Sequence, residues 1–188
     1  NNVCDGEILW AFASGEKGMV KNGREEIFPN DEEKSSKLRV AVSCFHVTEW
    51  ELRYVDYLKS LGHEVELVPL GASSKHCMLA KGEVDICPKF GKCSEWDVAA
   101  GQVLVEAAGG YVVNAETGGE VCYNKEDMIS PPFVMFGKRV YDEIKKGNKT
   151  FLDFKAKSVV KNDYLGARRN EIKKQDIMEK QYAKELVE

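Results

Sequence analysis

The chain has 188 residues, of which 43% are hydrophobic and 10% aromatic, with 27 basic and 31 acidic side chains. This apolar content with mixed charge excludes a disordered chain and suffices for one folded domain with an appendage. No stretch approaches the roughly 20 apolar residues that a membrane-spanning helix needs. The composition therefore predicts a soluble globular protein with no membrane span.

The charge is unevenly distributed along the chain. Residues 1–137 carry 13 basic and 22 acidic side chains, a net charge of −9, whereas residues 138–188 carry 14 and 9, a net charge of +5. An acidic body is not a general polyanion binder, so nucleic acid is not expected as a partner. Any phosphate that the body binds must lie in a local pocket.

The cysteines and the first residues indicate a reducing compartment. Six cysteines are scattered without a Cys-x-x-Cys pair, and the three histidines have no zinc-site spacing with them. The chain begins with neither methionine nor a signal-peptide pattern. We expect reduced thiols in a cytoplasmic protein, and a chain that does not begin where its gene does.

The first predicted element is a strand over residues 7–14 (EILWAFAS). Asn22-Gly23 is typical of a hairpin turn, and residues 29–36 form a polar connector. Residues 1–37 are therefore expected to be a β-hairpin remnant of an N-terminal sheet whose other strands are not in this chain.

Residues 38–137 alternate between strand and helix patterns, which predicts a layered α/β domain. Thr48 and Glu51 form a capping box that begins the first helix. The expected helices span 48–61, 73–81 and 96–108, and the expected strands span 38–43, 63–68, 84–87, 111–114 and 133–136. Residues 138–188 then predict a charged helical tail, with helices over 140–146 and 168–187.

The sequence WDVAAGQVLVEAAGG, residues 96–110, is the first stretch that indicates chemistry. Asp97 falls in the first turn of a predicted helix, beside backbone N–H groups that have no helical partner. Its carboxylate can act as a helix cap or as an oxygen ligand for a hard cation such as Mg²⁺.

The second such stretch is GASSKHC, residues 71–77, between a strand and a short helix. Gly71 permits a tight turn, the helix N-terminus offers N–H groups to an anion, and Lys75 adds a positive charge. This pattern fits a phosphate site, and it also fits a capped helix with an exposed lysine.

Both stretches resemble a known family. The sequence WDVAAGQVLVEAAGG is similar to the signature of the inositol monophosphatase superfamily of magnesium-dependent, lithium-sensitive phosphatases, which implies that Asp97 is a metal ligand. Residues 71–91, with KGEVD and CPKFG, resemble the 3′(2′),5′-bisphosphate nucleotidase branch (CysQ type). The implied fold is the C-terminal half of the layered αβαβα sugar-phosphatase fold, a mixed sheet flanked by helices.

The resemblance also implies which residues hold substrate. Lys75 matches the lysine that contacts a substrate phosphate, and Lys89 stands where the branch has an arginine for the nucleotide phosphate. His46 matches a histidine near the adenosine, and Ser73 belongs to the phosphate loop.

Three positions depart from the pattern of this branch and leave the substrate open. Ala72 replaces a serine, Cys44 replaces an arginine, and Lys89 replaces an arginine and so lacks its bidentate fork.

The implied activity is removal of the 3′-phosphate from 3′-phosphoadenosine 5′-phosphate to give AMP, as in sulfur assimilation. Most metal-binding carboxylates of the family lie N-terminal to the resembled region, and the Asp-Pro-x-Asp-Gly-Thr loop does not occur here. We therefore expect the chain alone to be inactive and to need the N-terminal portion of the fold as a partner. An inositol or sugar phosphate phosphatase and a non-catalytic nucleotide-binding fragment remain alternatives, and a homo-oligomer is compatible with each.

Overall fold

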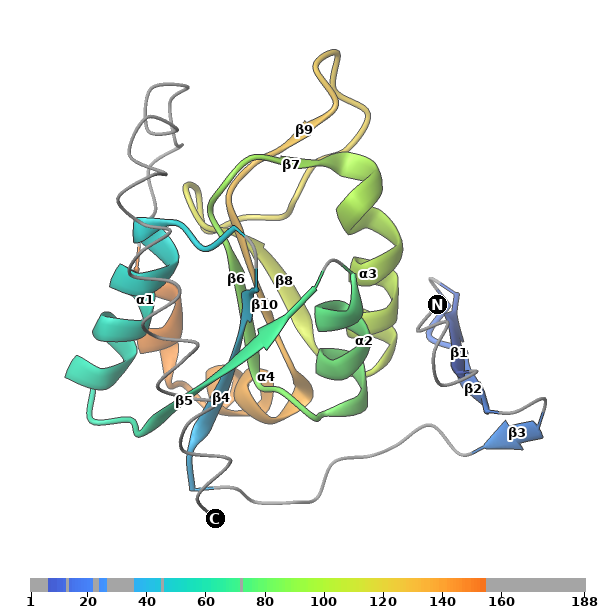
Figure 1. Ribbon diagram of the computed structural model, residues 1–188, viewed down its shortest axis with the longest axis horizontal. Coiled ribbons are helices and arrows are strands. Elements are labelled where there is room, and N and C mark those ends of the chain that lie inside the picture. The colour runs from blue at the N-terminus through green and yellow to red at the C-terminus, as the bar shows by residue number, and fades with distance from the viewer. Residues whose placement is uncertain are drawn as a thin grey trace.

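The computed structural model describes residues 7–12, 14–21, 24–26, 36–44, 46–71 and 73–154. A five-stranded mixed sheet with helices on both faces forms the centre, and a small antiparallel sheet lies beside it (Figure 1). The central strands, in spatial order, are β5 (Val65–Leu70), β4 (Leu38–Ser43), β6 (Ile86–Lys89), β10 (Phe133–Phe136) and β8 (Tyr111–Asn114). The helices are α1 (Glu49–Ser60), α2 (Ser74–Lys81), α3 (Glu95–Ala107), α4 (Lys138–Lys145) and the 3-10 helix η1 (Lys149–Leu152).

The direction of the strands decides where functional side chains can meet. Strand β4 pairs in parallel with β5 on one side and with β6 on the other, whereas β10 is antiparallel to both β6 and β8. The carboxyl ends of β4, β5 and β6 therefore lie at one edge of the sheet, the place where open α/β sheets bind their ligands.

Alternation along the strands divides the apolar side chains between the two faces. In β4, Val40 and Val42 belong to one buried cluster and Ala41 to the other; in β10, Phe136 and Met135 divide in the same way. This is the two-residue period of an extended strand. Because helices cover both faces of the sheet, the sequences of these strands are nearly continuous apolar runs.

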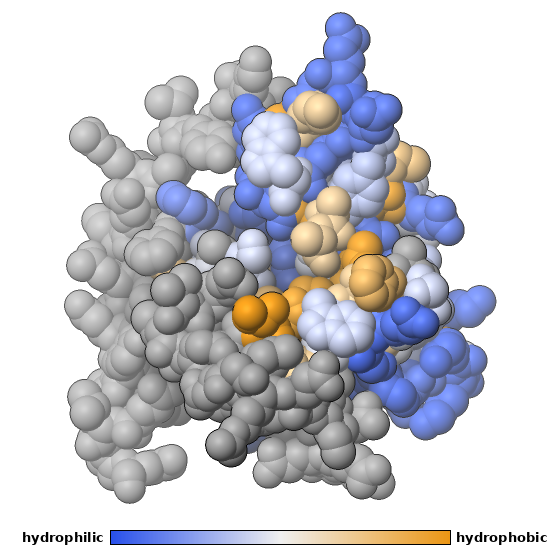
Figure 2. Space-filling model, turned by 90° about the vertical axis from the view of Figure 1, so that its right-hand side faces the viewer, coloured by the Kyte–Doolittle hydropathy of each residue, from blue (hydrophilic) through white to orange (hydrophobic). Residues whose placement is uncertain are grey.

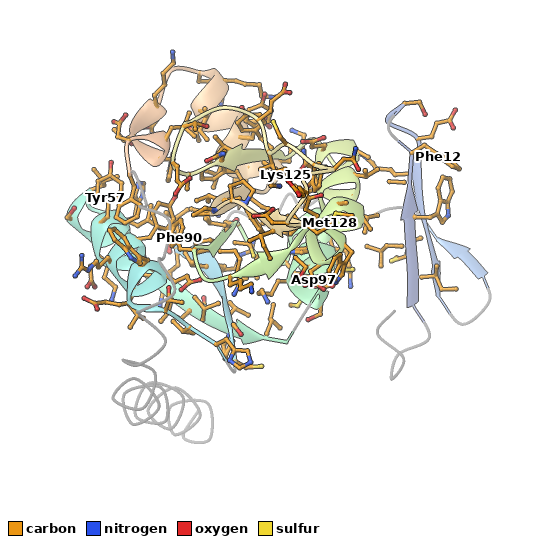
Figure 3. The ribbon with its side chains drawn as sticks, turned by 90° about the horizontal axis from the view of Figure 1, so that it is seen from above. Phe12, Tyr57, Phe90, Asp97, Lys125 and Met128 are labelled. Carbon is orange, nitrogen blue, oxygen red and sulfur yellow. The ribbon has the colours of Figure 1, made fainter. Side chains whose placement is uncertain are left out.

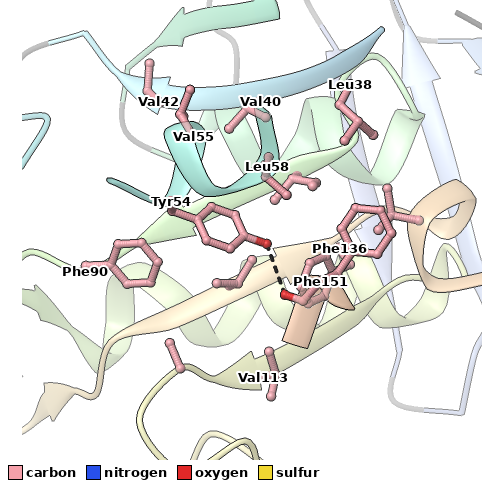
Figure 4. Close-up of a cluster of buried hydrophobic side chains, with 14 of the residues drawn as sticks. Leu38, Val40, Val42, Tyr54, Val55, Leu58, Phe90, Val113, Phe136 and Phe151 are labelled. Atoms are coloured by element: carbon pink, nitrogen blue, oxygen red, sulfur yellow. Dashed lines mark hydrogen bonds between the residues drawn. The ribbon is translucent and has the colours of Figure 1, made fainter. Parts of the chain in front are cut away.

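The first cluster lies between the sheet and the helices α1 and α4 (Figure 4). Tyr54 of α1 is fully buried, and its hydroxyl donates a hydrogen bond to the Phe151 carbonyl at 3.3 Å. Val140, Ile144 and Phe151 are buried in this cluster. The core therefore continues past residue 137, into the segment that we expected to be a charged tail.

The second cluster lies under α2 and α3, on the opposite face of the sheet. Leu79 of α2 and Val98 and Val105 of α3 are almost fully buried there. The two helices also touch each other where His76 packs on Gly101. This contact fixes α2 relative to the middle of α3.

Most predicted elements match the structure closely, but the strand expected over 7–14 ends at Ala11 and two further strands are shifted. Strands 38–43, 111–114 and 133–136 have the predicted bounds, and the Thr48–Glu51 capping box is confirmed. The strand expected over 84–87 is Ile86–Lys89, and that expected over 63–68 is Val65–Leu70. The short strands β7 (Cys93–Ser94) and β9 (Ile129–Ser130) were not predicted. The Asn22-Gly23 turn and the helix expected over 168–187 lie outside the described residues.

The predicted hairpin near the N-terminus is present as a three-stranded sheet of β1 (Glu7–Ala11), β2 (Lys17–Lys21) and β3 (Arg24–Glu26). Its inner side chains Leu9 and Met19 pack near Ala80 of α2 and Leu104 of α3. The outer side chains of β1 and the residue after it are exposed, and apolar residues gather on this side of the molecule (Figure 2). These outer residues are Ile8, Trp10 and Phe12.

Within the described residues, none of the helices has the length and apolarity that crossing a membrane requires.

Candidate phosphate site at the carboxyl edge

The residues that the sequence singled out gather at the carboxyl edge of the parallel strands. His46 follows β4, Ser73 and Lys75 follow β5, and Lys89 is the last residue of β6. Helix α3 begins a few residues after β6 and carries Asp97 in its first turn. Figure 3 looks down on this edge, with Phe90 after β6 and Asp97 at the beginning of α3.

Two lysines and one aspartate act together on a single thiol at this edge. Burial raises the pKa of the half-buried Cys93 thiol; the positive charges of Lys89 and Lys75 oppose this rise, and the negative charge of Asp97 adds to it. Lys75 and Lys89 act in the same direction on the buried Cys87. All three charges thus influence the same thiol at this edge.

The remaining predicted residues lie exposed at the same edge. The His46 amide donates a hydrogen bond to the Ser43 hydroxyl at 2.9 Å, which closes the turn after β4. The Cys44 amide donates to the Leu70 carbonyl at 3.2 Å, so the loops after β4 and β5 are joined. Both His46 and Ser73 are exposed, whereas the Lys75 side chain is only 7% exposed. The charged centre is thus partly buried, with polar groups at its rim.

The position of the Asp97 carboxylate suits one oxygen ligand of a metal ion. Its carboxylate is exposed in the first turn of α3, where the partial positive charge of the helix end favours an acidic group. Within the residues that the structure describes, no three His, Cys, Asp or Glu side chains form a group that could hold a metal ion. Asp97 therefore fits Mg²⁺ as one ligand, and the described residues do not complete a site.

Glu95, two residues before Asp97, has a different partner that the sequence did not reveal. Its carboxylate accepts hydrogen bonds from the Asn124 amide and from the Lys125 ammonium, and its amide donates to the Met128 carbonyl at 3.0 Å. Lys125 holds the pKa of this carboxyl below its usual value. Glu95 therefore anchors the 124–128 loop beside the first turn of α3. The partners are about 30 residues apart in sequence, and no local pattern links them.

The Cys87 and Cys93 thiols are not suited to nucleophilic attack. Burial raises the pKa of Cys87 to about 11 and raises that of Cys93 above its usual value. The thiol, rather than the thiolate, therefore predominates near neutral pH, although the thiolate is the nucleophile. This agrees with the absence of a cysteine-phosphatase loop in the sequence.

His76, next to Lys75 on α2, forms the contact with Gly101 of α3. Its side chain is buried, and its Nδ1 atom has no hydrogen-bond partner among the described residues. Burial, followed by the neighbouring charge of Lys75, lowers the pKa of His76 to about 4, against a smaller opposing effect of Asp97. The ring is therefore neutral at physiological pH.

The neutral His76 predicts a loss of stability in mild acid. Its pKa is about 4 when folded and 6.5 in the unfolded chain, so the unfolded state binds the proton first as the pH falls. Stability should be complete above pH 6.5 and decrease toward pH 4, where this one group costs about 3 kcal/mol. Urea unfolding across this range checks the slope. His76→Gln should reduce this slope, and an unchanged slope in His76→Gln would contradict the assignment.

Comparison with known proteins places this chain and its fold in one family. Residues 2–146 match the model of the inositol monophosphatase family. The match covers most of the chain, and the chain therefore belongs to the inositol monophosphatase family.

Its curated relatives include nucleotidases of the CysQ type. The chain is 37% identical over 95 residues to 3′(2′),5′-bisphosphate nucleotidase CysQ of Salmonella typhimurium, covering 50% of this chain and 37% of that protein. It is 35% identical over 79 residues to the Escherichia coli K12 protein of the same name, covering 42% and 31%.

A solved structure shows the same fold. CysQ from Bacteroides thetaiotaomicron, a bacterial member of this family, superimposes with a TM-score of 0.65 at 28% identity and covers 72% of this chain. The alignment spans 55% of that protein. The chain therefore spans about a third to a half of the length of these CysQ relatives.

Proposed function

We propose that the chain forms the substrate-binding half of a CysQ-like phosphatase that acts on 3′-phosphoadenosine 5′-phosphate. The observation that supports this proposal is that Lys75, Lys89 and Asp97 all lie on elements that follow or end the parallel strands at one edge of the sheet. Two ammonium groups beside one carboxylate suit a phosphorylated ligand that is held together with a cation. The names of the CysQ relatives support the nucleotide as the substrate.

The two lysines come from different elements, which suits a ligand with two phosphates. In the proposed arrangement Lys75 binds the 3′-phosphate, Lys89 the 5′-phosphate, and the exposed His46 and Ser73 the rest of the nucleotide. In the hydrolysis, a water oxygen bonds to phosphorus as the bond from phosphorus to the 3′-oxygen breaks. The 3′-oxygen takes a proton, and AMP and inorganic phosphate are released.

Asp97 is the residue that would hold Mg²⁺ in this proposal. A bound magnesium ion supplies a Lewis acid and a more acidic water molecule for phosphate hydrolysis. Since the described residues do not complete a metal site, we propose that the other carboxylates come from the N-terminal portion of the same fold. The exposed apolar side chains of β1 offer a surface against which that portion would pack.

The proposal predicts binding without turnover. The purified chain should bind 3′-phosphoadenosine 5′-phosphate, also called adenosine 3′,5′-bisphosphate, in calorimetric titration. It should release no phosphate from this compound, with or without Mg²⁺. Robust magnesium-dependent phosphate release by the chain alone would contradict the view that its metal site is incomplete. A folded sample with no detectable binding would contradict the binding role.

An inositol or sugar phosphate is the second candidate substrate, favoured by the lysine at position 89. Lys89 keeps the charge of the arginine that it replaces but loses the planar fork that recognises a phosphate with two parallel bonds. Titration with inositol 1-phosphate separates the candidates: tighter binding than that of the bisphosphate would favour the sugar phosphate.

A further inference from the structure

A buried carboxylate joins two of the loops that form the proposed site. Glu51 in the first turn of α1 is 2% exposed. One of its oxygens, Oε2, accepts the Thr48 amide at 2.6 Å and also bonds to the Thr48 hydroxyl. The other oxygen, Oε1, accepts the amides of Phe90 at 3.0 Å and Gly91 at 3.4 Å. Thr48 follows β4 and Gly91 follows β6, so a single side chain bridges the ends of two strands.

The bridging bonds exceed what capping requires. A capping box needs only the return bond from the carboxylate to the N-cap amide, which Thr48 supplies. The bonds to Phe90 and Gly91 reach residues about 40 positions away and satisfy backbone donors at the end of a buried strand. A buried amide without such a partner is costly, so these bonds hold the second loop in place.

The two loops touch directly beside the Lys89 ammonium. A Cβ atom added at Gly91 would lie 2.9 Å from Cγ2 of Thr48 and 3.4 Å from Nζ of Lys89. The glycine therefore permits a close approach that a side chain would prevent. The spacing between the loop that carries His46 and the strand end that carries Lys89 is set at this point.

We propose that Glu51 is a positioning residue that fixes His46 and Lys89 at the separation needed for a ligand contacting both loops. This inference rests on the proposed function, because it concerns the same edge and the same ligand class. Glu51 acts through the loops, and inorganic phosphate, which is too small to span them, is much less sensitive to their spacing.

The test compares two probes, adenosine 3′,5′-bisphosphate and inorganic phosphate, on the full chain. Glu51→Gln replaces one acceptor oxygen by an NH₂ group. Either the bonds to Thr48 or the bonds to Phe90 and Gly91 are then lost, and the loss of either pair breaks the bridge. Since each charge-assisted hydrogen bond carries roughly a tenfold effect, we expect bisphosphate affinity to fall about tenfold and phosphate affinity to change less than about twofold. Glu49→Gln is the matched control, because Glu49 is exposed on the same helix turn and pairs only with Arg53 among its described contacts. Equal losses for both probes, or none, would overturn the inference.

Amide hydrogen exchange tests the same link without a ligand. The Phe90 and Gly91 amides should exchange faster in Glu51→Ala, which removes both carboxylate oxygens, than in the wild-type chain, while the Ala115 amide, bonded to the Pro132 carbonyl, should not change. If the wild-type chain binds neither probe, the proposed function fails and exchange alone decides the positioning role. Unchanged exchange at Phe90 and Gly91 would overturn that role whatever the ligand.

A second pair of variants separates the loops without altering Glu51. Gly91→Ala places a methyl group against Cγ2 of Thr48, so it should weaken bisphosphate binding several-fold. Thr48→Ser removes that methyl group and keeps the hydroxyl and amide. Adding Thr48→Ser to Gly91→Ala should therefore restore most of the affinity, and a double variant as weak as Gly91→Ala alone would contradict the inference.

Discussion

Lys75→Met should weaken the binding of adenosine 3′,5′-bisphosphate and of inorganic phosphate by roughly 10- to 100-fold, the effect of losing one charge-assisted hydrogen bond in a partly buried site. Methionine nearly preserves the length and apolar stem of lysine and removes only the ammonium group. Lys75 is 7% exposed in the first turn of α2. An anion at this helix end therefore meets a charge that water screens only weakly. Calorimetric titration measures the loss.

Lys92→Met is the matched control for Lys75→Met. Lys92 is an exposed lysine just after β6, so the substitution makes the same change in net charge near the same edge. A second readout follows from the influence of Lys75 on His76: without this charge the pKa of His76 should rise from about 4. Equal binding losses in the two variants would show that net charge, rather than a placed ammonium group, attracts the ligand.

Gly101→Ala should destabilise the fold by about 2–3 kcal/mol, at the upper end of what overpacking costs in a buried site. A Cβ atom at this position would lie 2.1 Å from Nδ1 and 2.6 Å from Cγ of His76. The helices α2 and α3 would have to separate, or the imidazole would have to leave its buried place. Either movement shifts Lys75 relative to Asp97. Urea unfolding measures the stability change.

A double-mutant cycle assigns this cost to the His76 contact. In a His76→Ala background the same Gly101→Ala change should be neutral, or should stabilise the chain by up to about 1 kcal/mol, because alanine favours a helix more than glycine does. The same destabilisation in both backgrounds would mean that the clash lies elsewhere.

Much of the fold follows from local sequence signals. Strands β4, β8 and β10 have their predicted bounds because each is a short apolar run between residues that interrupt it. Strand β6 was predicted two residues early and ended before Pro88, which has no amide hydrogen to donate within a sheet. In the structure Pro88 pairs with Val134 inside the sheet. Strands β7 and β9 have two residues each, too few to show a period.

The residues proposed for the site remain predictions, and the hydrogen bonds that join their loops could not be predicted from the sequence. Lys75, Lys89 and Asp97 were proposed from motifs, and the parallel order of β4, β5 and β6 brings their positions to one edge. Glu51 was predicted only as a cap, because its bonds to Phe90 and Gly91 depend on the distant return of β6. The pairing of Glu95 with Lys125 was missed for the same reason.

The carboxyl edge of β4, β5 and β6 is the proposed binding place of a phosphorylated nucleotide. The most direct measurement is an NMR titration of the isotopically labelled chain with adenosine 3′,5′-bisphosphate. Saturable shifts should concentrate at Lys75, Lys89, Asp97 and the turn around His46, and should leave the outer face of β1 unchanged. A folded chain with no shifts, or with shifts confined to other surfaces, would contradict the account.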